Sequence, residues 1–186
     1  MPILVAYATS EGQTRRIARR VADHIADHGQ TVELLGLGDA DDIDLQRFDG
    51  VILAASVHGG RYQTTLTDFA AEHAAKLANI PSLFLSVSLS AAGHDAEDWT
   101  GLDRVRQDFE HATGWSPAQV EQIAGAYRPS QYDVFRRFIM RRIIAIKDPE
   151  ADLGADKEYT DWPALEQLID RWLTPAQTKA TSQPVA

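Results

Sequence analysis

The chain of 186 residues contains no cysteine. The absence of thiols excludes disulfide bonds, thiolate catalysis, iron–sulfur clusters and zinc sites with cysteine ligands. It is compatible with the reducing conditions of the cytoplasm, which is the location we expect. No stretch approaches the roughly 18 apolar residues of a membrane span, and no basic segment followed by an apolar one resembles a secretory signal.

Positive charge is scarce: 18 Lys and Arg stand against 27 Asp and Glu, for a net charge of −9. An acidic balance of this size argues against general nucleic-acid binding, so no nucleic-acid partner is expected. Segment 134–147 is the exception, because it contains four arginines, one lysine and no acidic residue among apolar side chains. This basic and apolar segment therefore needs an explanation of its own.

The motifs of two common hydrolase classes are missing. The five histidines other than His58 form neither an H-x-x-E-H nor an H-E-x-x-H motif. They are His24, His28, His73, His94 and His111. No G-x-S-x-G nucleophile elbow is present either. We therefore expect no metal site, and we assign no side chain as a catalytic acid, base or nucleophile.

Apolar runs alternate with amphipathic helical patterns along most of the chain. The pattern predicts strands over 2–8, 31–35, 51–56, 82–89 and 120–127, and helices over 14–28, 64–78, 101–113 and from 161–163 onward. This alternation is typical of a doubly wound α/β fold with a five-stranded parallel sheet. We expect a single domain over 1–173 with a basic-apolar helical insertion at about 128–158, followed by a disordered tail over 174–186.

Three loops follow predicted strands 1, 3 and 4. In open parallel sheets the ligand binds outside the carboxyl ends of the strands. This rule directs attention to residues 9–14, 56–62 and 88–95. We expect these loops to meet around one ligand.

The first loop reads Thr9-Ser10-Glu11-Gly12-Gln13-Thr14 and stands between a buried strand and a helix start. Helix N-termini offer unpaired N–H groups and a favourable dipole to an anion, and hydroxyl groups add further donors. The loop has neither G-x-G-x-x-G nor a P-loop lysine. It therefore predicts a neutral cradle for a monoester phosphate, with an ordinary capped turn as the alternative.

The second and third loops are built of small and polar residues that allow a planar ring to approach the backbone. The second reads Ser56-Val57-His58-Gly59-Gly60-Arg61-Tyr62, and the third begins Ser86-Val87-Ser88-Leu89-Ser90. His58 either hydrogen-bonds the ligand or is simply exposed, and Tyr62 either stacks on a ring or anchors the next helix. Each of these loops alone is weak evidence for a ligand site. Three such loops in the places that the fold predicts are stronger evidence.

The first loop resembles the flavodoxin phosphate loop, Ser/Thr-x-Thr-Gly-x-Thr, with Thr9, Gly12 and Thr14 in the matching places. Glu11 departs from this pattern, because the family prefers threonine there. The resemblance implies the flavodoxin-like strand order 2-1-3-4-5. It also implies that residues 56–61 lie beside a flavin ring.

A closer resemblance rests on several motifs in the same order. They are Gly12-Gln13-Thr14, Ala54-Ala55-Ser56-Val57, Ser86-Val87-Ser88-Leu89, Ile123-Ala124-Gly125-Ala126, the segment 132–147 and Tyr159-Thr160-Asp161-Trp162. In this set the chain is similar to the flavodoxin-type protoporphyrinogen IX dehydrogenases, over about residues 3–173. It departs at Gly59, where the family has an aromatic residue.

The resemblance implies an FMN enzyme of haem biosynthesis that passes electrons from protoporphyrinogen IX to a quinone, either menaquinone or ubiquinone. The flavin supplies the redox chemistry. The implied FMN-binding residues are Thr9, Ser10, Glu11, Gly12, Gln13, Thr14, Ser56, Val57, His58, Gly59, Gly60, Arg61, Ser86, Val87, Ser88, Leu89 and Ser90.

The arginines of segment 134–147 have two uses in such an enzyme. Arg136, Arg137, Arg141 and Arg142 either attract an anionic membrane surface or bind porphyrin propionates. We expect reversible, salt-sensitive binding to the inner face of the cell membrane. A structural helix packed on the sheet is the plain alternative.

Other functions stay open from the sequence. They are a flavodoxin-like electron carrier, an NAD(P)H:quinone reductase and a flavodoxin-like module without flavin. The basic segment favours the enzyme, because a carrier that binds basic partners would more naturally have an acidic face around its flavin. Nothing in the sequence decides between a monomer and a homo-oligomer.

Overall fold

The computed structural model describes residues 2–39, 43–93, 95–131, 140–141, 143–146 and 148–180. Its central feature is a five-stranded parallel sheet in the order β2-β1-β3-β4-β5, as predicted. The strands are β1 (Pro2–Ala8), β2 (Thr31–Gly36), β3 (Gly50–Ser56), β4 (Ser82–Ser88) and β5 (Gln119–Ala124). A separate antiparallel pair consists of β6 (Ala126–Tyr127) and β7 (Lys157–Glu158).

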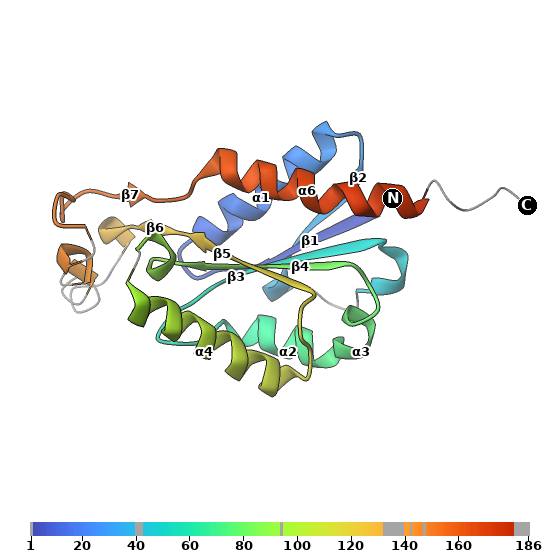
Figure 1. Ribbon diagram of the computed structural model, residues 1–186, viewed down its shortest axis with the longest axis horizontal. Coiled ribbons are helices and arrows are strands. Elements are labelled where there is room, and N and C mark those ends of the chain that lie inside the picture. Colours follow the sequence, from blue (N-terminus) through green and yellow to red (C-terminus); the bar gives the residue numbers. More distant parts are fainter. Residues whose placement is uncertain are drawn as a thin grey trace, which may run out of the picture.

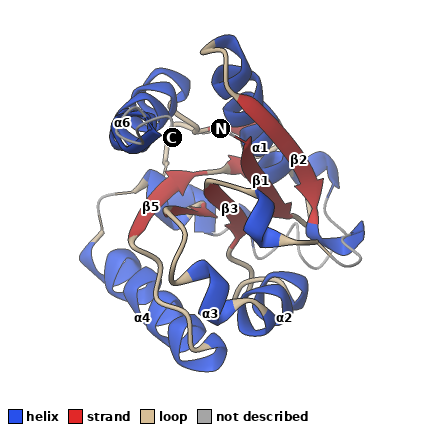
Figure 2. Ribbon diagram, turned by 90° about the vertical axis from the view of Figure 1, so that its right-hand side faces the viewer, coloured by secondary structure: helices blue, strands red, loops and turns tan. Residues whose placement is uncertain are grey.

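Helices cover both faces of this sheet (Figures 1 and 2). On one face lie α1 (Gln13–Asp27) and α6 (Trp162–Ala180), and on the other lie α2 (Thr64–Glu72), α3 (Ala74–Leu77) and α4 (Ala96–Thr113). Short 3-10 turns occupy Leu37–Asp39, Leu45–Arg47, Ser90–Ala92 and Pro129–Gln131. Among the residues described, no helix is long and apolar enough to cross a membrane.

The two cores follow from the apolar periodicity. Ile17, Val21 and Ile25 of α1 are all at most 1% exposed and pack with the α6 stripe that includes Leu168 and Ile169. Burying apolar faces of this kind on both sides stabilises a sheet whose strands β3 and β4 are buried almost throughout. The sequence therefore predicts this layering correctly.

Several element boundaries differ from the predicted ones. The helix expected over 64–78 is divided into α2 and α3 at His73, whose φ of −105° and ψ of 11° leave the helical region. Helix α4 starts at Ala96 instead of residue 101, because the carboxylate of Asp95 accepts a hydrogen bond from the Glu97 N–H and caps it. Helix α6 continues to Ala180, past the expected end of order at 173.

The strand expected over 120–127 is also divided. Gly125 separates β5 from β6 and donates its N–H to the carbonyl of Ser88, while its own carbonyl accepts from Tyr159 N–H. The chain therefore leaves the main sheet at Gly125 and pairs with β7 instead. This departure places β6 and β7 at the end of the sheet where the parallel strands finish (Figure 1).

Candidate functional site

One pocket of about 690 Å³ lies at the carboxyl ends of β1, β3 and β4. This volume is within the range of small-molecule and cofactor sites. Its lining comes from all three predicted loops and from two segments near the C-terminus: Thr9, Ser10, Glu11, Gln13, Thr14, Ser56, Val57, His58, Gly59, Gly60, Val87, Ser88, Leu89, Ser90, Gly125, Ala126, Met140 and Ile143.

The first loop forms the turn into α1. Gly12 has φ +86°, which glycine adopts without strain, and its N–H donates to Thr9 Oγ1 over 2.9 Å. Thr14, in the first turn of α1, is 1% exposed and lines the pocket. Its hydroxyl is buried and has no hydrogen-bond partner among the residues that the structure describes. A buried hydroxyl without a hydrogen-bond partner lowers the stability of the fold. The Thr14 hydroxyl is therefore suited to donate a hydrogen bond to an oxygen of a bound ligand.

Glu11, the departure from the flavodoxin pattern, also lines the pocket and is half-buried. Its carboxylate therefore belongs to the wall of the predicted phosphate cradle. Gly12 itself lies behind the lining, where it closes the turn onto Thr9.

The second loop is a tight turn. Gly59 and Gly60 have φ of +57° and +77°, and His58 and Arg61 pair through two backbone hydrogen bonds of 2.9 and 3.2 Å. Positive φ at both central residues is the geometry of a two-residue hairpin, which strongly favours glycine. Both glycines line the pocket, and a Cβ at either position would have no heavy atom within 4 Å. The place of the aromatic residue that the family has at 59 is therefore open space in this chain.

Arg61 points elsewhere. It is exposed and lines a neighbouring hollow with Arg15 and Tyr7 instead of the pocket. Thr9, Ser10 and His58 line both hollows, so Arg61 lies beside these predicted cofactor-binding residues without lining the pocket itself.

Tyr62 is a core residue. It is 7% exposed, packs edge-on against Phe84 and Phe109, and donates its hydroxyl to Ser86 Oγ over 2.9 Å. Burial raises the pKa of this phenol above its ordinary value, so it stays a donor. Of the two roles predicted for Tyr62, this burial favours anchoring, because the ring packs in the core and does not line the pocket.

Ser86, its partner, is fully buried and does not line the pocket. The prediction assigned Ser86 to the cofactor as one of several small, hydroxyl-bearing residues at a strand end. Ser86 lies two residues before the end of β4, on the face that packs against the core containing Tyr62.

A glutamine that the sequence analysis did not single out links two of the loops. Gln63 Nε2 donates to Ser56 Oγ over 2.5 Å and to Ser10 Oγ over 3.2 Å. This amide therefore holds the first and second loops at a fixed separation beside the pocket. No local motif marks Gln63, because its partners lie on other strands.

The third loop joins the others through main-chain contacts. Val57 N–H donates to the Val87 carbonyl over 2.8 Å, and Ala91 N–H donates to Ser88 Oγ over 3.1 Å. Gly125 and Ala126, just past β5, complete this side of the pocket. These two residues belong to the motif Ile123-Ala124-Gly125-Ala126. The motif was predicted as part of a strand and used for the family resemblance, and its place in the pocket wall was not predicted.

An apolar wall comes from the insertion. Met140 and Ile143 line the pocket, and the neighbouring Ile144 is 1% exposed and packs against Tyr127. Tyr127 donates its hydroxyl to the Leu153 carbonyl over 3.1 Å. The insertion therefore has a small core of its own that holds this wall in place.

The predicted arginines of the insertion are only partly covered by the structure. Arg141 is exposed, and Arg136, Arg137 and Arg142 lie outside the described residues. Ile146, four residues from Arg142 along the chain, is 80% exposed. The described part of segment 134–147 thus places apolar side chains both against the pocket and in solvent.

Gln13 connects the pocket to the C-terminal motif. Its Nε2 donates to Glu158 Oε1 over 2.6 Å and to Thr160 Oγ1 over 3.0 Å, while its Oε1 accepts from Arg128 over 2.8 Å. Arg16 adds an ion pair with Glu158 over 2.8 Å. The motifs Gly12-Gln13-Thr14 and Tyr159-Thr160-Asp161-Trp162 are therefore one hydrogen-bonded unit, although they lie far apart in the sequence.

The far side of the insertion is fixed by a second polar group. Asp148 accepts hydrogen bonds from Lys157 and from the Tyr159 hydroxyl, and these bonds lower the pKa of its carboxyl group. Burial, and then the neighbouring Asp148, raise the pKa of Tyr159. This arrangement keeps the carboxylate charged and the phenol neutral, as a structural hydrogen bond requires.

Comparison with known proteins gives relatives of similar length. A protein of Escherichia coli (strain K12) named protoporphyrinogen IX dehydrogenase (quinone) is 29% identical over 162 residues, which are 87% of this chain and 89% of that protein. A protein of the same name from Leishmania major is 28% identical over 166 residues, 89% of this chain and 71% of that one.

Solved flavodoxins share the fold. Oxidised flavodoxin 1 from Bacillus cereus has a TM-score of 0.56 at 12% identity, with 94% of this chain and 98% of that chain covered. A short-chain flavodoxin associated with a non-canonical PDU bacterial microcompartment has a TM-score of 0.59 at 15% identity, with 95% and 99% covered.

The model of the flavodoxin domain matches residues 4–153, which include all three loops and most of the insertion. FMN is the cofactor that this match and the flavodoxin neighbours indicate. With its strand order and its pocket at the carboxyl ends of the strands, the chain belongs to the flavodoxin domain family.

Proposed function

We propose that this chain is an FMN-dependent oxidoreductase that takes electrons from protoporphyrinogen IX and passes them to a quinone. The observation that carries the proposal is the pocket itself, in which a polar cradle at the start of α1 faces an apolar wall from the insertion. When bound, FMN supplies reversible two-electron redox chemistry. The relatives named protoporphyrinogen IX dehydrogenase (quinone) support the choice of substrate and acceptor.

The residues of the chain would divide the binding task. Thr14 Oγ1 and the N–H groups at the start of α1 would hold the phosphate, since both are donors at a helix N-terminus. The turn at Gly59 and Gly60 and the segment Val87–Ser90 would flank the ring, because they offer backbone groups and little side-chain bulk. No general acid or base is assigned among the residues lining the pocket.

Met140 and Ile143 would serve the substrate. Both protoporphyrinogen and a quinone are largely apolar, and burial of apolar surface is the main favourable term for such ligands. These two side chains would also exclude water from that side of the cofactor. An electron carrier has no need of an apolar wall of this kind.

The test is anaerobic turnover by the flavin-loaded protein. We expect porphyrin fluorescence to rise when protoporphyrinogen IX and a menaquinone analogue are both supplied, and to stay near the background rate when the quinone is omitted. Yellow protein that gives no quinone-dependent rise in fluorescence would favour the electron carrier. Quinone reduction that needs NAD(P)H instead would favour the reductase.

We also propose peripheral binding to the inner face of the membrane through Arg136, Arg137, Arg141 and Arg142. Arg141 and Ile146 are exposed, and an arginine-rich segment with exposed apolar residues suits an anionic lipid surface. We expect the protein to float with vesicles containing anionic lipid and to be released by salt.

The test variant replaces all four arginines of the segment by glutamine. It should stay in the soluble fraction, while replacement of Arg15, Arg19, Arg104 and Arg171, which lie elsewhere on the surface, should leave flotation unchanged. Equal flotation of the wild type and the first variant would contradict membrane binding through this segment.

A further inference from the structure

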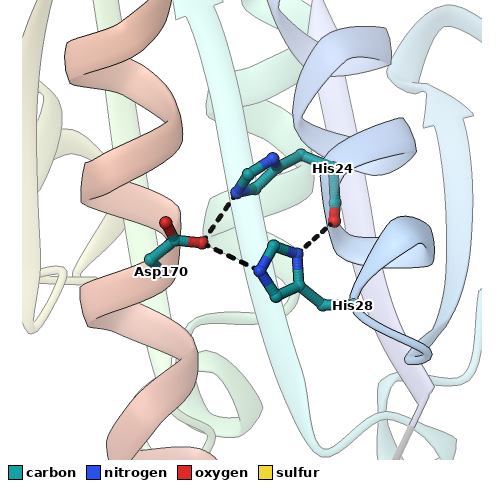
Figure 3. Close-up of side chains that lie close together, drawn as sticks. All are labelled: His24, His28 and Asp170. Atoms are coloured by element: carbon teal, nitrogen blue, oxygen red, sulfur yellow. Dashed lines mark hydrogen bonds and ion pairs between the residues drawn. The ribbon is translucent and has the colours of Figure 1, made fainter.

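His24 of α1, His28 just past the end of α1 and Asp170 of α6 converge on a single point (Figure 3). His24 Nε2 lies 2.7 Å from Asp170 Oδ1, and His28 Nε2 lies 3.3 Å from the same oxygen. One atom from each of the three residues lies within 4.8 Å of the others. Since α1 rises about 1.5 Å per residue, His24 is roughly 16 Å along the helix from Gln13, so this cluster is remote from the pocket.

The hydrogen bond on the far side of the His28 ring decides how the ring faces the cluster. His28 Nδ1 lies 2.8 Å from the carbonyl oxygen of His24. A carbonyl only accepts, so Nδ1 carries the proton and Nε2 of the neutral ring presents a lone pair. That lone pair faces the carboxylate oxygen of Asp170, and two acceptors at 3.3 Å need a cation between them or a second proton on the ring.

The same geometry is the usual support of a metal-bound imidazole. Ligating histidines generally donate their other ring nitrogen to a carbonyl or carboxylate, which fixes the tautomer and the ring orientation. Here the support comes from the backbone of the other histidine, one helical turn away. The ring of His28 is therefore oriented for coordination by its hydrogen bond to the carbonyl of His24 in the last turn of α1.

The donor set selects the class of metal. Two imidazole nitrogens and one carboxylate oxygen suit Zn²⁺ and neighbouring first-row ions, whereas Ca²⁺ and Mg²⁺ prefer oxygen ligands alone. A tetrahedral ion with bonds of about 2.0–2.1 Å separates its ligand atoms by about 3.3 Å. The observed spacing within 4.8 Å needs only small side-chain movements to reach this value.

The cluster is also reachable from solvent. The side chains of His28 and Asp170 are 43% and 47% exposed, and His24 is 16% exposed. Three protein ligands leave a fourth position for water. An ion there would join α1 to α6, two helices that also share the ion pair of Arg20 with Glu166 on the same face of the sheet.

We infer that His24, His28 and Asp170 form a structural binding site for Zn²⁺ or a similar transition-metal ion, independent of the flavin pocket. No metal site was predicted from the sequence, because the histidines form neither H-x-x-E-H nor H-E-x-x-H. The third ligand, Asp170, lies in another helix near the other end of the chain. The two histidines at positions i and i+4 are the only local signal.

The test is calorimetric titration of Zn²⁺ into the chelator-treated, flavin-loaded protein. We expect one ion per chain, and an affinity that falls by roughly 10-fold or more in Asp170→Asn and further in the double variant His24→Gln/His28→Gln. His111→Gln removes an exposed histidine elsewhere on the surface and should bind zinc as the wild type does. Zinc should raise the melting temperature of the wild type and of His111→Gln, and leave that of the double variant unchanged.

The absorption spectrum of bound Co²⁺ gives a second readout that does not rely on affinity. The wild type should show the intense visible absorption bands of a tetrahedral cobalt ion, and Asp170→Asn should lose them. Equal zinc affinity in the wild type and the double variant, or weak octahedral-type cobalt bands in the wild type, would overturn the site. The three side chains would then be a histidine–carboxylate ion pair between helices and nothing more.

Discussion

Thr14→Val is expected to weaken FMN binding by about 10- to 100-fold without destabilising the protein that lacks flavin. The hydroxyl of Thr14 is buried in the pocket wall, and no described residue is its hydrogen-bond partner. A hydrogen bond to a charged group contributes about 1.5–3 kcal/mol, so loss of a bond to the phosphate accounts for this fall in affinity. Valine has the same shape and removes an unsatisfied polar atom, so the apoprotein should be as stable as before or slightly more stable.

Thr113→Val is the matched control for this prediction. Thr113 is 6% exposed, and its hydroxyl donates to the Phe109 carbonyl over 2.9 Å and accepts from Trp115 N–H over 3.2 Å. Its replacement should lower stability by about 1–3 kcal/mol, because Trp115 N–H loses its partner, and should leave FMN affinity unchanged. Flavin fluorescence titration and urea unfolding of the apoproteins measure both quantities. Wild-type FMN affinity in Thr14→Val would show that its hydroxyl does not face the phosphate.

Gln13→Leu is expected to lower the free energy of unfolding of the apoprotein by about 2–4 kcal/mol. The side chain is 5% exposed and pairs with Glu158, Thr160 and Arg128. Leucine fills the same space and leaves these three groups with fewer partners in a partly buried place. The loss of stability should be largest where the C-terminal motif attaches to α1, since Gln13 donates to Thr160 of that motif and to the neighbouring Glu158.

Arg20→Gln is the control on the same helix. The ion pair of Arg20 with Glu166 is exposed on the arginine side, and pairs of this kind contribute about 0–1 kcal/mol. We expect a change at the low end of that range in urea unfolding. A change of similar size in Gln13→Leu would mean that the Gln13 network contributes no more than a surface pair.

The periodic parts of the fold could be predicted from the sequence. The apolar run of β3 and the stripe Ile17, Val21 and Ile25 have one plausible burial each, so the layers on the two faces of the sheet followed. The pocket was also predictable, because loops that follow parallel strands meet at one edge. These inferences need only local pattern and a topological rule.

The remaining parts depend on contacts between distant residues. Ser86 was assigned to the ligand, yet it accepts from Tyr62 inside the core. Gln63 and Gln13 carry no local mark, and their partners lie on other loops or near the C-terminus. Met140 and Ile143 belong to an insertion whose position is set by a small core around Tyr127. Only the tertiary structure shows which residues these are.

The most direct test of the central proposal is the anaerobic absorption spectrum of the flavin-loaded protein. Addition of protoporphyrinogen IX alone should bleach the absorption of oxidised FMN in a single two-electron step without sustained porphyrin formation, and subsequent addition of menaquinone should restore it and start turnover. An oxidised flavin spectrum that does not change with protoporphyrinogen IX, but is bleached by NADPH, would contradict the account.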